Sequence, residues 1–470
     1  MNWDQLLSAV RFGQENLDQR QHARTEFQRD YDRLIFSPSF RRLQNKTQVF
    51  PLPGAVFVHN RLTHSLEVAS VGRSLANNVS MALVEKYRSR GREEGQDEQQ
   101  LAWIDKLQSL DDIVATACLA HDMGNPPFGH SGERAIISFF LEGPGQRFQE
   151  VLTPQQWADL THFDGNANAF RLLTHQFRGH REGGFALTYS ALASIIKYPY
   201  ASTVAGPKPK FGFFQAEEEA FMRVAERLGL QEIDIEGSLG LDTPAEGQLF
   251  PEQPQHRYSR HPLCFLVEAA DDICYQIMDI EDAHNLKLLS TAETQELLLG
   301  FHEGETRAKI ERGLKHVADI NEQIGYLRSR AIGTLVWECT QVFLEHEEEI
   351  LAGTFQKPLI RCIPEVAAQA YQHCSEVAFS RIYRSKDVVD IEVAGYQIIS
   401  ALLEKFIDAV MHPQRSYSRL LLDRIPAQYD TRAEGIYPRI LAVLDYVSGM
   451  TDVYALDLYR KIYGMSLPSL

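Results

Sequence analysis

The amino-acid sequence predicts an all-α, mainly helical protein. Over most of the chain, apolar residues recur at intervals of three and four, the period of an amphipathic helix, and the alternation typical of a half-buried strand is scarce. The composition can fill a large core, because 44% of the 470 residues are hydrophobic. No break in composition divides the chain cleanly, so we expect one large helical body.

Two predicted helices come first, and each carries a polar motif at one end. The first starts around His64, and its apolar positions fall at helical spacing, at Leu66, Val68, Val71, Leu75, Ala76 and Val79. The second begins at the pair Asp111-Asp112, which can cap it, and ends at the pair His121-Asp122. The charged stretch 87–100 between the two predicts an exposed connection.

The segment from His121 to Glu133 holds two histidines and two carboxylates around a turn rich in glycine and proline. His121 and Asp122 offer one nitrogen and one oxygen ligand, a mixture that suits a divalent metal such as Mn, Fe, Zn or Mg. The glycines and prolines end the helix, and Ser131 can cap the next one. His130 and Glu133 then share a face of that helix, where a carboxylate can orient a proton-transferring imidazole.

A third polar motif lies on the strongly helical segment 268–282. Asp271, Tyr275 and Asp279 are spaced at i, i+4 and i+8, which places them close to one stripe. Like charges near one another on a helix repel, and a cation or a sugar hydroxyl would offset the cost. The apolar residues around these positions leave little of the helix circumference for water. We therefore expect this stripe to face a site.

The net charge of −16 argues against a protein that binds nucleic acid through a general basic surface. An anionic ligand must instead meet local cations. The candidates are Arg41-Arg42, Arg61, Lys197, Lys208, Lys210 and the run from His256 to His261. Residues 199–257, rich in proline and glycine, predict a long surface excursion, which is either functional or contains short elements of its own.

Cysteine spacing and the first residues predict a cytoplasmic location. The six cysteines show no CxxC spacing and indicate reduced, mostly buried thiols. The first residues lack a basic end followed by an apolar run, so we expect no signal peptide. No apolar stretch approaches the ~18 residues of a transmembrane helix, so we expect no membrane partner.

Several ordered motifs together resemble the HD-domain deoxynucleoside triphosphate triphosphohydrolases, the dGTPase family. The resemblance spans about residues 25 to 465. The segments that carry it are 36–43, 46–50, 61–67, 121–133, 197–199, 210–212, 268–273 and 448–455. It implies the HD phosphohydrolase fold with helical extensions. Its expected parts are an N-terminal segment (1–60) that contributes to the nucleotide site, an HD core (61–285) with the excursion at 199–257, and a C-terminal helical region (286–470) packed on the core.

The resemblance also implies one divalent metal ion, held by four side chains. These are His64, His121, Asp122 and Asp271, with Asp272 as the register alternative for the last. Mn²⁺ or Mg²⁺ is the expected ion, and Fe, Co, Ni or Zn are the alternatives. We favour Asp271 because it puts Tyr275 and Asp279 at the spacing that this family uses for its sugar contacts.

The reaction that the resemblance implies is hydrolysis of a dNTP at the α-phosphorus, which releases a deoxynucleoside and tripolyphosphate, with dGTP as the leading candidate. His130, oriented by Glu133, is expected to move the proton, as acid or as base. The expected phosphate contacts are Arg61, Lys197 and Lys210. Tyr275 is expected to crowd the 2′ position, and Gln48 and Asp279 to bond the 3′ hydroxyl. Similar proteins imply a dimer-based homo-oligomer, up to a tetramer or hexamer, and a dNTP or single-stranded DNA as effector.

Two other hypotheses remain open at this stage. One is another HD-type phosphohydrolase, with the same metal but a different scissile bond; it leaves the Gly/Pro segment and the stripe of Tyr275 and Asp279 unexplained. The other is a catalytically silent nucleotide sensor or single-strand nucleic-acid binder. The complete set of metal ligands and the pair His130 and Glu133 argue against it.

Overall fold

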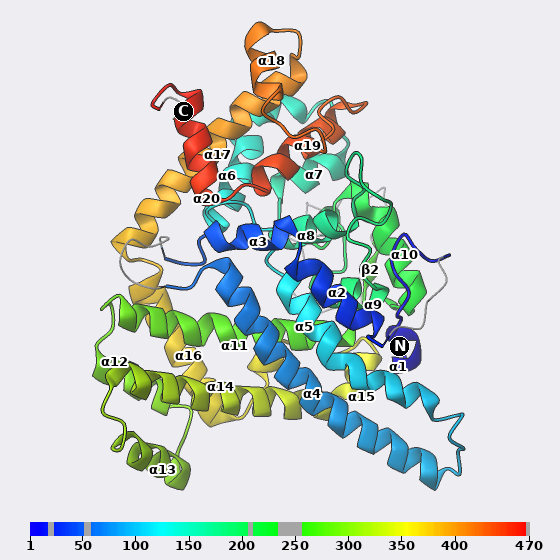
Figure 1. Cartoon of the computed structure of the whole chain (residues 1–470), viewed down its shortest axis with the longest axis vertical. Helices are drawn as coiled ribbons and strands as arrows, with labels where there is room; N and C mark the ends of the chain where they lie inside the picture. The colour runs from blue at the N-terminus through cyan, green and yellow to red at the C-terminus, as the bar shows by residue number, and fades with distance from the viewer. Residues whose placement is uncertain (17–22, 51–57, 205–209, 234–255, 467–470) are drawn as a thin grey trace.

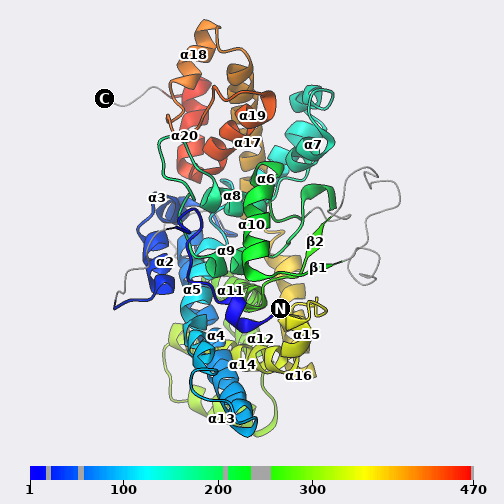
Figure 2. The same ribbon diagram turned by 90° about the vertical axis from the view of Figure 1, so that its right-hand side faces the viewer.

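The protein is mainly helical, as the sequence predicts (Figures 1 and 2). The structure is a computed structural model, and it describes residues 1–16, 23–50, 58–204, 210–233 and 256–466. Within this part of the chain, the strands are two short segments that pair antiparallel, β1 (Glu232–Ile233) and β2 (Arg257–Tyr258). None of the described helices is both long and apolar enough to span a bilayer.

Four helices pack as one group around the first long helix of the chain. They are α4 (Arg61–Glu93), α5 (Leu110–Ala120), α11 (Pro262–Asn285) and α14 (Ile320–Glu345). α4 packs along α5 and crosses α11 and α14 (Figure 1). Asn60 and Thr63 form a capping box that fixes the first residue of α4, so the chain enters this helix three residues before His64.

The stretch 87–100 was expected to be a connection outside the helices, but its first half is helical because α4 continues to Glu93. Arg90 donates to Glu94, an i, i+4 pair that supports the last turns of the helix. Gly91 lies where Leu101 returns against α4, and a Cβ at Gly91 would stand 2.4 Å from Leu101 Cδ2. This glycine therefore permits close packing of the returning chain and does not end the helix.

The start of α5 also differs from its expected cap. α5 begins at Leu110, after Ser109, whose side chain makes no capping bond. Asp111 and Asp112 lie in the first turn, where their negative charges interact favourably with the helix dipole. The end of α5 agrees with the prediction, because Ala120 is its last residue and His121 follows directly.

The remaining helices form two groups around separate hydrophobic cores. The lower core lies around α4, α5 and α11 and includes Val68, Leu75 and Ile273. The other helices that border it are α1 (Trp3–Leu6), α2 (Glu26–Ile35), α3 (Pro38–Arg41), α9 (Tyr189–Ile195), α10 (Glu218–Leu228), α12 (Thr291–Leu299), α13 (Gly304–Leu314), α15 (Glu347–Leu351) and α16 (Glu365–Val377). All six cysteines are free thiols, and five are buried.

The upper core joins the middle of the chain to its C-terminal helices. It contains Phe140 and Phe163 from the middle of the chain and Leu402, Phe406 and Val443 from the C-terminal part. The helices are α6 (His130–Leu141), α7 (Pro154–Thr161), α8 (Gly165–Thr174), α17 (Lys386–Met411), α18 (Ser416–Leu422), α19 (Ile436–Ser448) and α20 (Asp452–Ile462). α17 packs along α6 and rises to the top of the molecule (Figures 1 and 2).

The excursion 199–257 has elements of its own in the residues that the structure describes. α10 lies on α9, and β1 pairs with β2 at the point where the chain returns to α11. Tyr258 donates from its backbone to Pro199, which closes the two ends of the excursion on each other. Lys208 lies outside the described residues.

Candidate active site

The side chains predicted to hold a metal come together where α4, α5 and α11 meet. His64 lies in the first turn of α4, and His121 and Asp122 follow α5 directly. One ligand atom from each of these three lies within 4.8 Å of the others, close enough for a shared metal ion. Asp271 of α11 completes the group, with its Oδ1 3.0 Å from His64 Nε2 and 3.4 Å from His121 Nε2.

The ring of His121 is oriented as a metal ligand requires. Its Nδ1 donates to the carbonyl of Cys118 at 2.6 Å, because the last turn of α5 leaves that carbonyl free. Nε2 is then the unprotonated nitrogen of the neutral ring, and it faces Asp122 and Asp271. This buried atom makes no hydrogen bond in the described part of the chain. A donor set of two imidazoles and two carboxylates, with one buried nitrogen left unpaired, fits a divalent metal.

Arg61 keeps the neighbouring carboxylate ionised. Burial by itself raises the pKa of Asp122, but Arg61 Nη1 lies 2.7 Å from its Oδ2 and the net pKa falls below the ordinary value. Burial likewise raises the pKa of Asp271, and the two histidines outweigh it and hold this pKa well below the usual range. Both carboxylates are therefore available as anionic ligands at neutral pH.

Asp122 is also held from the opposite side by Asn125. The Asn125 side-chain amide donates to Asp122 Oδ1, and its backbone carbonyl accepts from Lys46 Nζ at 2.5 Å. Lys46 donates further to the Ser448 carbonyl at 2.7 Å. Burial, followed by the charge of Arg61, lowers the pKa of Lys46 to about 7. Residues from three distant parts of the chain thus fix the position of one ligand.

The turn after Asp122 begins α6 in a way that differs from the sequence prediction. Gly129 precedes the helix with φ +56°, and no side chain caps it. Ser131, expected to be the cap, lies inside the helix and donates to the Glu392 carbonyl of α17. His130 is the first residue of α6 and is exposed, and its side chain makes no hydrogen bond to any described residue.

Glu133 is buried, and its hydrogen bond goes elsewhere than expected. Its Oε1 accepts from the backbone N–H of Gly165 at 2.8 Å, at the start of α8. Among the described residues, no hydrogen bond joins Glu133 to His130, although the two are three apart on α6 and line the same cavity. The structure therefore brings the pair to one site without the orienting contact.

A cavity of about 230 Å³ joins these groups. The candidate metal-binding cluster borders it through His121, Asp122 and Asp271, and His130 and Glu133 lie on its wall. Among its other lining residues are Asn125, Lys197, Tyr198, Lys210 and Glu268. Three of the four predicted metal ligands, both predicted proton-transfer residues and two of the three predicted phosphate contacts therefore line one cavity.

The two lysines in this cavity are each paired with a carboxylate. Lys197 Nζ lies 3.0 Å from Glu268 Oε1, and Lys210 Nζ lies 2.9 Å from Asp164 Oδ2. Burial lowers the pKa of Lys197, but Glu268 outweighs it and raises the pKa above the ordinary value. Both side chains are therefore positively charged at the edge of the cavity.

Tyr275 and Asp279, two of the three residues predicted to recognise a sugar, lie further along α11. Asp279 is buried, and burial raises its pKa to about 8. It accepts a hydrogen bond of 2.5 Å from Tyr383, whose ring lies 6.0 Å from the ring of Tyr275. Gln48 forms no hydrogen bond with Tyr275 or Asp279 among the described residues, and its Oε1 is buried without a hydrogen-bond partner there.

Tyr383 was not predicted from the sequence. It stands 104 residues after Asp279, just beyond the π-helical turn Ala378–Ile382, and no motif around it marks it. Asn125 lay inside the predicted turn but had no role assigned to it. Its signal was its position three residues after Asp122, which lets a side-chain amide reach back to the carboxylate.

Comparison with known proteins agrees with this geometry. The HD domain family matches residues 61–152, which contain His64 and the pair His121-Asp122. A protein of Synechocystis named deoxyguanosinetriphosphate triphosphohydrolase-like is 37% identical, over 99% of this chain and 100% of its own length. The chain belongs to the deoxyguanosinetriphosphate triphosphohydrolase-like family. It is thus an HD-domain phosphohydrolase by family.

Other matches cover the same length and extend to the C-terminal region. A protein of the same name from Pseudomonas aeruginosa is 35% identical over the whole of both chains. A deoxyguanosinetriphosphate triphosphohydrolase from Yersinia enterocolitica is 29% identical over 93% of each. The phosphohydrolase-associated domain family matches residues 362–461, which include Tyr383, α17 and Asp452.

Proposed function

We propose that this protein is a metal-dependent dNTP triphosphohydrolase that releases a deoxynucleoside and tripolyphosphate. The observation that carries the proposal is the cavity of about 230 Å³, because it brings a metal-type cluster, an unpaired histidine and two lysines to one place. The names of the relatives support a purine deoxynucleotide, so dGTP is the leading substrate. The proposed location is the cytoplasm, and the proposed assembly is a homo-oligomer.

His64, His121, Asp122 and Asp271 would hold the ion, with Mn²⁺ or Mg²⁺ proposed. A bound divalent ion supplies an activated water and neutralises charge on the α-phosphate. Arg61 is buried and holds Asp122 in place, and Asn125 fixes the other oxygen of the same carboxylate. These contacts preserve the ligand geometry before substrate arrives.

His130 is proposed to carry the proton. Its imidazole is exposed on the cavity wall and free of hydrogen bonds among the described residues, so it can reach a substrate oxygen. The leaving group is an alkoxide, which needs a proton to depart. Lys197 and Lys210 are placed to meet phosphate oxygens, where a fixed positive charge stabilises the transition state.

Asp279, Tyr275 and Tyr383 are proposed to select the sugar. A buried carboxyl with a raised pKa and one tyrosine partner has capacity left for a substrate hydroxyl. The ring of Tyr275 is half-buried beside this carboxyl, where bulk can exclude a 2′ hydroxyl. Gln48, with its unpaired Oε1, is kept as the proposed second partner of the 3′ hydroxyl.

Product analysis tests the reaction. The purified protein is incubated with Mn²⁺ and each dNTP singly, then with all four together, and the products are separated by chromatography. Deoxynucleoside plus tripolyphosphate is the expected result, and the rates rank the bases. Monophosphate plus pyrophosphate, or single phosphates, would contradict the proposal and favour a different HD phosphohydrolase. Turnover that occurs only in the mixture would identify a nucleotide effector.

Replacement of His130 tests the proton-transfer role. We expect His130→Ala to lower kcat by about 10²- to 10⁴-fold, the usual contribution of a general acid or base. Metal content and dNTP binding should persist, since the His130 side chain forms no hydrogen bond or ion pair with the candidate metal ligands among the described residues. The matched control is His316→Ala, an exposed histidine on a turn far along the chain. Unchanged kcat in His130→Ala would remove this residue from the mechanism.

A further inference from the structure

The turn between α5 and α6 contains two consecutive residues with positive φ. Phe128 has φ +61° and Gly129 has φ +56°, and His130, the first residue of α6, follows at once. Glycine adopts such angles freely, but a bulky side chain at positive φ strains the backbone and persists only where its surroundings hold it. Strain of this kind collects at functional sites. The proposed function leaves this strained residue without a role.

Two C-terminal helices hold Phe128 in this conformation. Its backbone N–H donates to Asp452 Oδ1 of α20 at 2.9 Å. Its side chain packs against Gly395 of α17, where a Cβ on Gly395 would stand 2.5 Å from Phe128 Cβ and 2.6 Å from its Cγ. Because these are the near atoms of the Phe128 side chain, rotation of the ring cannot relieve such a clash. The backbone of Phe128 would have to move.

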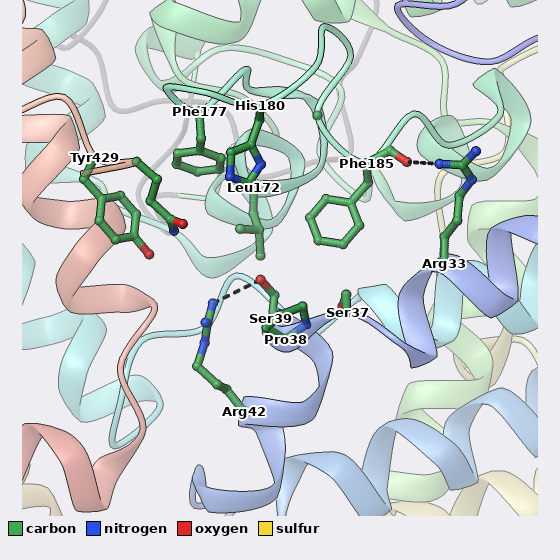
Figure 3. A pocket seen from close by; sticks show the side chains of 12 residues that line it. Arg33, Ser37, Pro38, Ser39, Arg42, Leu172, Phe177, His180, Phe185 and Tyr429 are labelled. Atoms are coloured by element: carbon green, nitrogen blue, oxygen red, sulfur yellow. Dashed lines mark hydrogen bonds between the residues drawn. The ribbon is translucent and has the colours of Figure 1, made fainter. Parts of the chain in front are cut away.

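Phe128 does not line a described cavity that a ligand could occupy. It is absent from the wall of the candidate active-site cavity and from that of a second cavity, of about 330 Å³, beside α2, α3 and α8 (Figure 3). Its ring packs instead against the upper core. Contact with a ligand in either cavity therefore does not explain the strained conformation.

His130 depends on this turn for its position. Its side chain is exposed on the cavity wall and forms no hydrogen bond to any described residue. Glu133, which was expected to orient it, accepts from the Gly165 N–H instead. The direction of the imidazole therefore follows from the backbone that leads into α6. Misplacement of a catalytic group by about 1 Å can cost about 100-fold in rate.

We propose that Phe128, packed against Gly395 of α17, is a positioning residue that fixes where His130 enters the candidate active-site cavity. The two C-terminal helices hold the strained turn, and the turn sets the direction of the first residue of α6. α17 itself contributes no lining residue to this cavity, so it acts on the site through Phe128. The inference rests on the proposed function, because it concerns the histidine proposed to carry the proton.

Gly395→Ala tests this role. The new methyl group would stand 2.5 Å from Phe128 Cβ, so Phe128 must move, and His130 with it. With dGTP and Mn²⁺ we expect kcat to fall by about 10- to 100-fold, while KM and manganese content stay unchanged, because only the proton transfer is misplaced. Gly333→Ala, at an exposed glycine of α14 with open space around it, is the matched control and should leave kcat unchanged. A raised KM with unchanged kcat in Gly395→Ala would overturn the proposal.

A double variant separates positioning by Phe128 from a general loss of packing. Phe128→Gly can keep the same φ without strain, and it removes the side chain that meets Gly395. Its own kcat should fall, because the turn is no longer held. Addition of Gly395→Ala to Phe128→Gly should then cost nothing more, since the methyl group has no side chain to displace. Losses that multiply in the double variant would overturn the proposal.

Nuclear magnetic resonance of the full-length protein, labelled with ¹³C-histidine, tests the inference without any turnover. The signal of the His130 ring is identified by its absence in His130→Ala. At one fixed pH it should shift or broaden in Gly395→Ala and in Phe128→Gly, and stay unchanged in Gly333→Ala. Thermal melting shows which variants fold, and either turn variant suffices for the comparison.

The two readouts distinguish failure of the inference from failure of the proposed function. An unchanged His130 signal in the folded turn variants would overturn the inference, whatever their activity. A shifted signal in a protein that hydrolyses no dNTP would support the positioning role and contradict the proposed function alone.

Discussion

Of the two adjacent aspartates of α11, Asp271 and not Asp272 faces the candidate metal-binding cluster. Asp271 lies beside both histidines. The carboxylate of Asp272 accepts no hydrogen bond from the described residues, and Asp272 does not line the cavity. Burial raises the pKa of Asp272 to about 7, while the pKa of Asp271 is held low. The geometry supports Asp271 as the ligand.

Two neighbouring substitutions test this assignment. Asp271→Asn keeps the shape of the side chain and removes its charge, so we expect the protein to retain less than about a tenth of the wild-type manganese after dialysis, in line with the cost of losing a charged ligand. Asp272→Asn is the matched control and should retain wild-type metal. Metal content measured by mass spectrometry decides between the two aspartates. Loss of manganese in Asp272→Asn alone would identify Asp272 as the ligand in place of Asp271.

The sequence indicated the candidate metal ligands as a set because each belongs to an ordered motif of several residues. His64, His121 and Asp122 lie within reach of one ion in the structure. Tyr383 could not be predicted in the same way. Its contact with Asp279 depends on how α16 and its π-helical continuation pack on α11, and neither residue carries a local pattern that points to the other.

Helix ends were the least predictable elements. A serine just inside a helix resembles a cap in sequence. The Ser131 hydroxyl instead donates to the Glu392 carbonyl of α17, 261 residues away. The extent of α4 was missed because charged residues suggest a loop, although arginine and glutamate are good helix formers. The end of α5 was predicted correctly, because glycines and prolines follow it at once.

The turn between α5 and α6 depends on a glycine for packing. A Cβ at Gly124 would lie 2.1 Å from the Gly165 carbonyl oxygen and 2.2 Å from the Ala169 nitrogen, both of them backbone atoms of α8. Gly124→Ala should lower the free energy of unfolding by about 3 kcal/mol, the upper end for an overpacked site. Gly325→Ala, in open space on α14, should raise it by about 0.5–1 kcal/mol. Urea denaturation measures both, and equal effects would contradict this view of the turn.

The start of α11 predicts how stability depends on pH. His261 is buried, accepts from Leu263 N–H and donates to the Leu6 carbonyl. Burial lowers its pKa from 6.5 to about 4. The unfolded chain therefore protonates His261 more readily than the folded protein does. The stability that the neutral ring contributes is lost as the pH falls from 6.5 towards about 4.

Because of His261, we expect the free energy of unfolding to fall by about 2 kcal/mol as the pH falls from 7 to 5. His261→Asn removes the titrating ring and keeps a capping side chain, so its unfolding free energy should change less over this range than that of the wild type. Denaturant unfolding at each pH gives the comparison. Parallel pH profiles for the two proteins would contradict this prediction, because they would show that the pKa of His261 is the same in the folded and the unfolded state.

At the scale of the whole molecule, the candidate site is held by contacts between the N-terminal part, the middle and the C-terminal helices. Asp452, the first residue of α20, accepts from the Thr47 N–H at 2.7 Å with one oxygen and from the Phe128 N–H at 2.9 Å with the other. It therefore joins the segment before α4 to the turn that precedes His130.

Replacement of Asp452 should affect both stability and turnover without any contact to substrate. Asp452→Asn leaves only one acceptor oxygen for two N–H donors, so we expect a loss of about 1–3 kcal/mol in the free energy of unfolding and a lower kcat. Asp457→Asn, which breaks a half-buried i, i+4 pair with Lys461, is the control and should change stability by less than about 0.5 kcal/mol. Wild-type stability and kcat in Asp452→Asn would show that this connection is dispensable.

The bonds of Asp452 and Lys46 also determine when the site can form during synthesis. Thr47 and Asp452 are 405 residues apart, and Lys46 and Ser448 are 402 apart. Contacts of such long sequence separation form late, and domains fold as the ribosome releases them. When α4 and α5 have left the ribosome but α20 has not, His64 and His121 would therefore lie beside a turn between α5 and α6 that Asp452 does not yet hold. Nearly the entire chain must leave the ribosome before its candidate catalytic centre is complete.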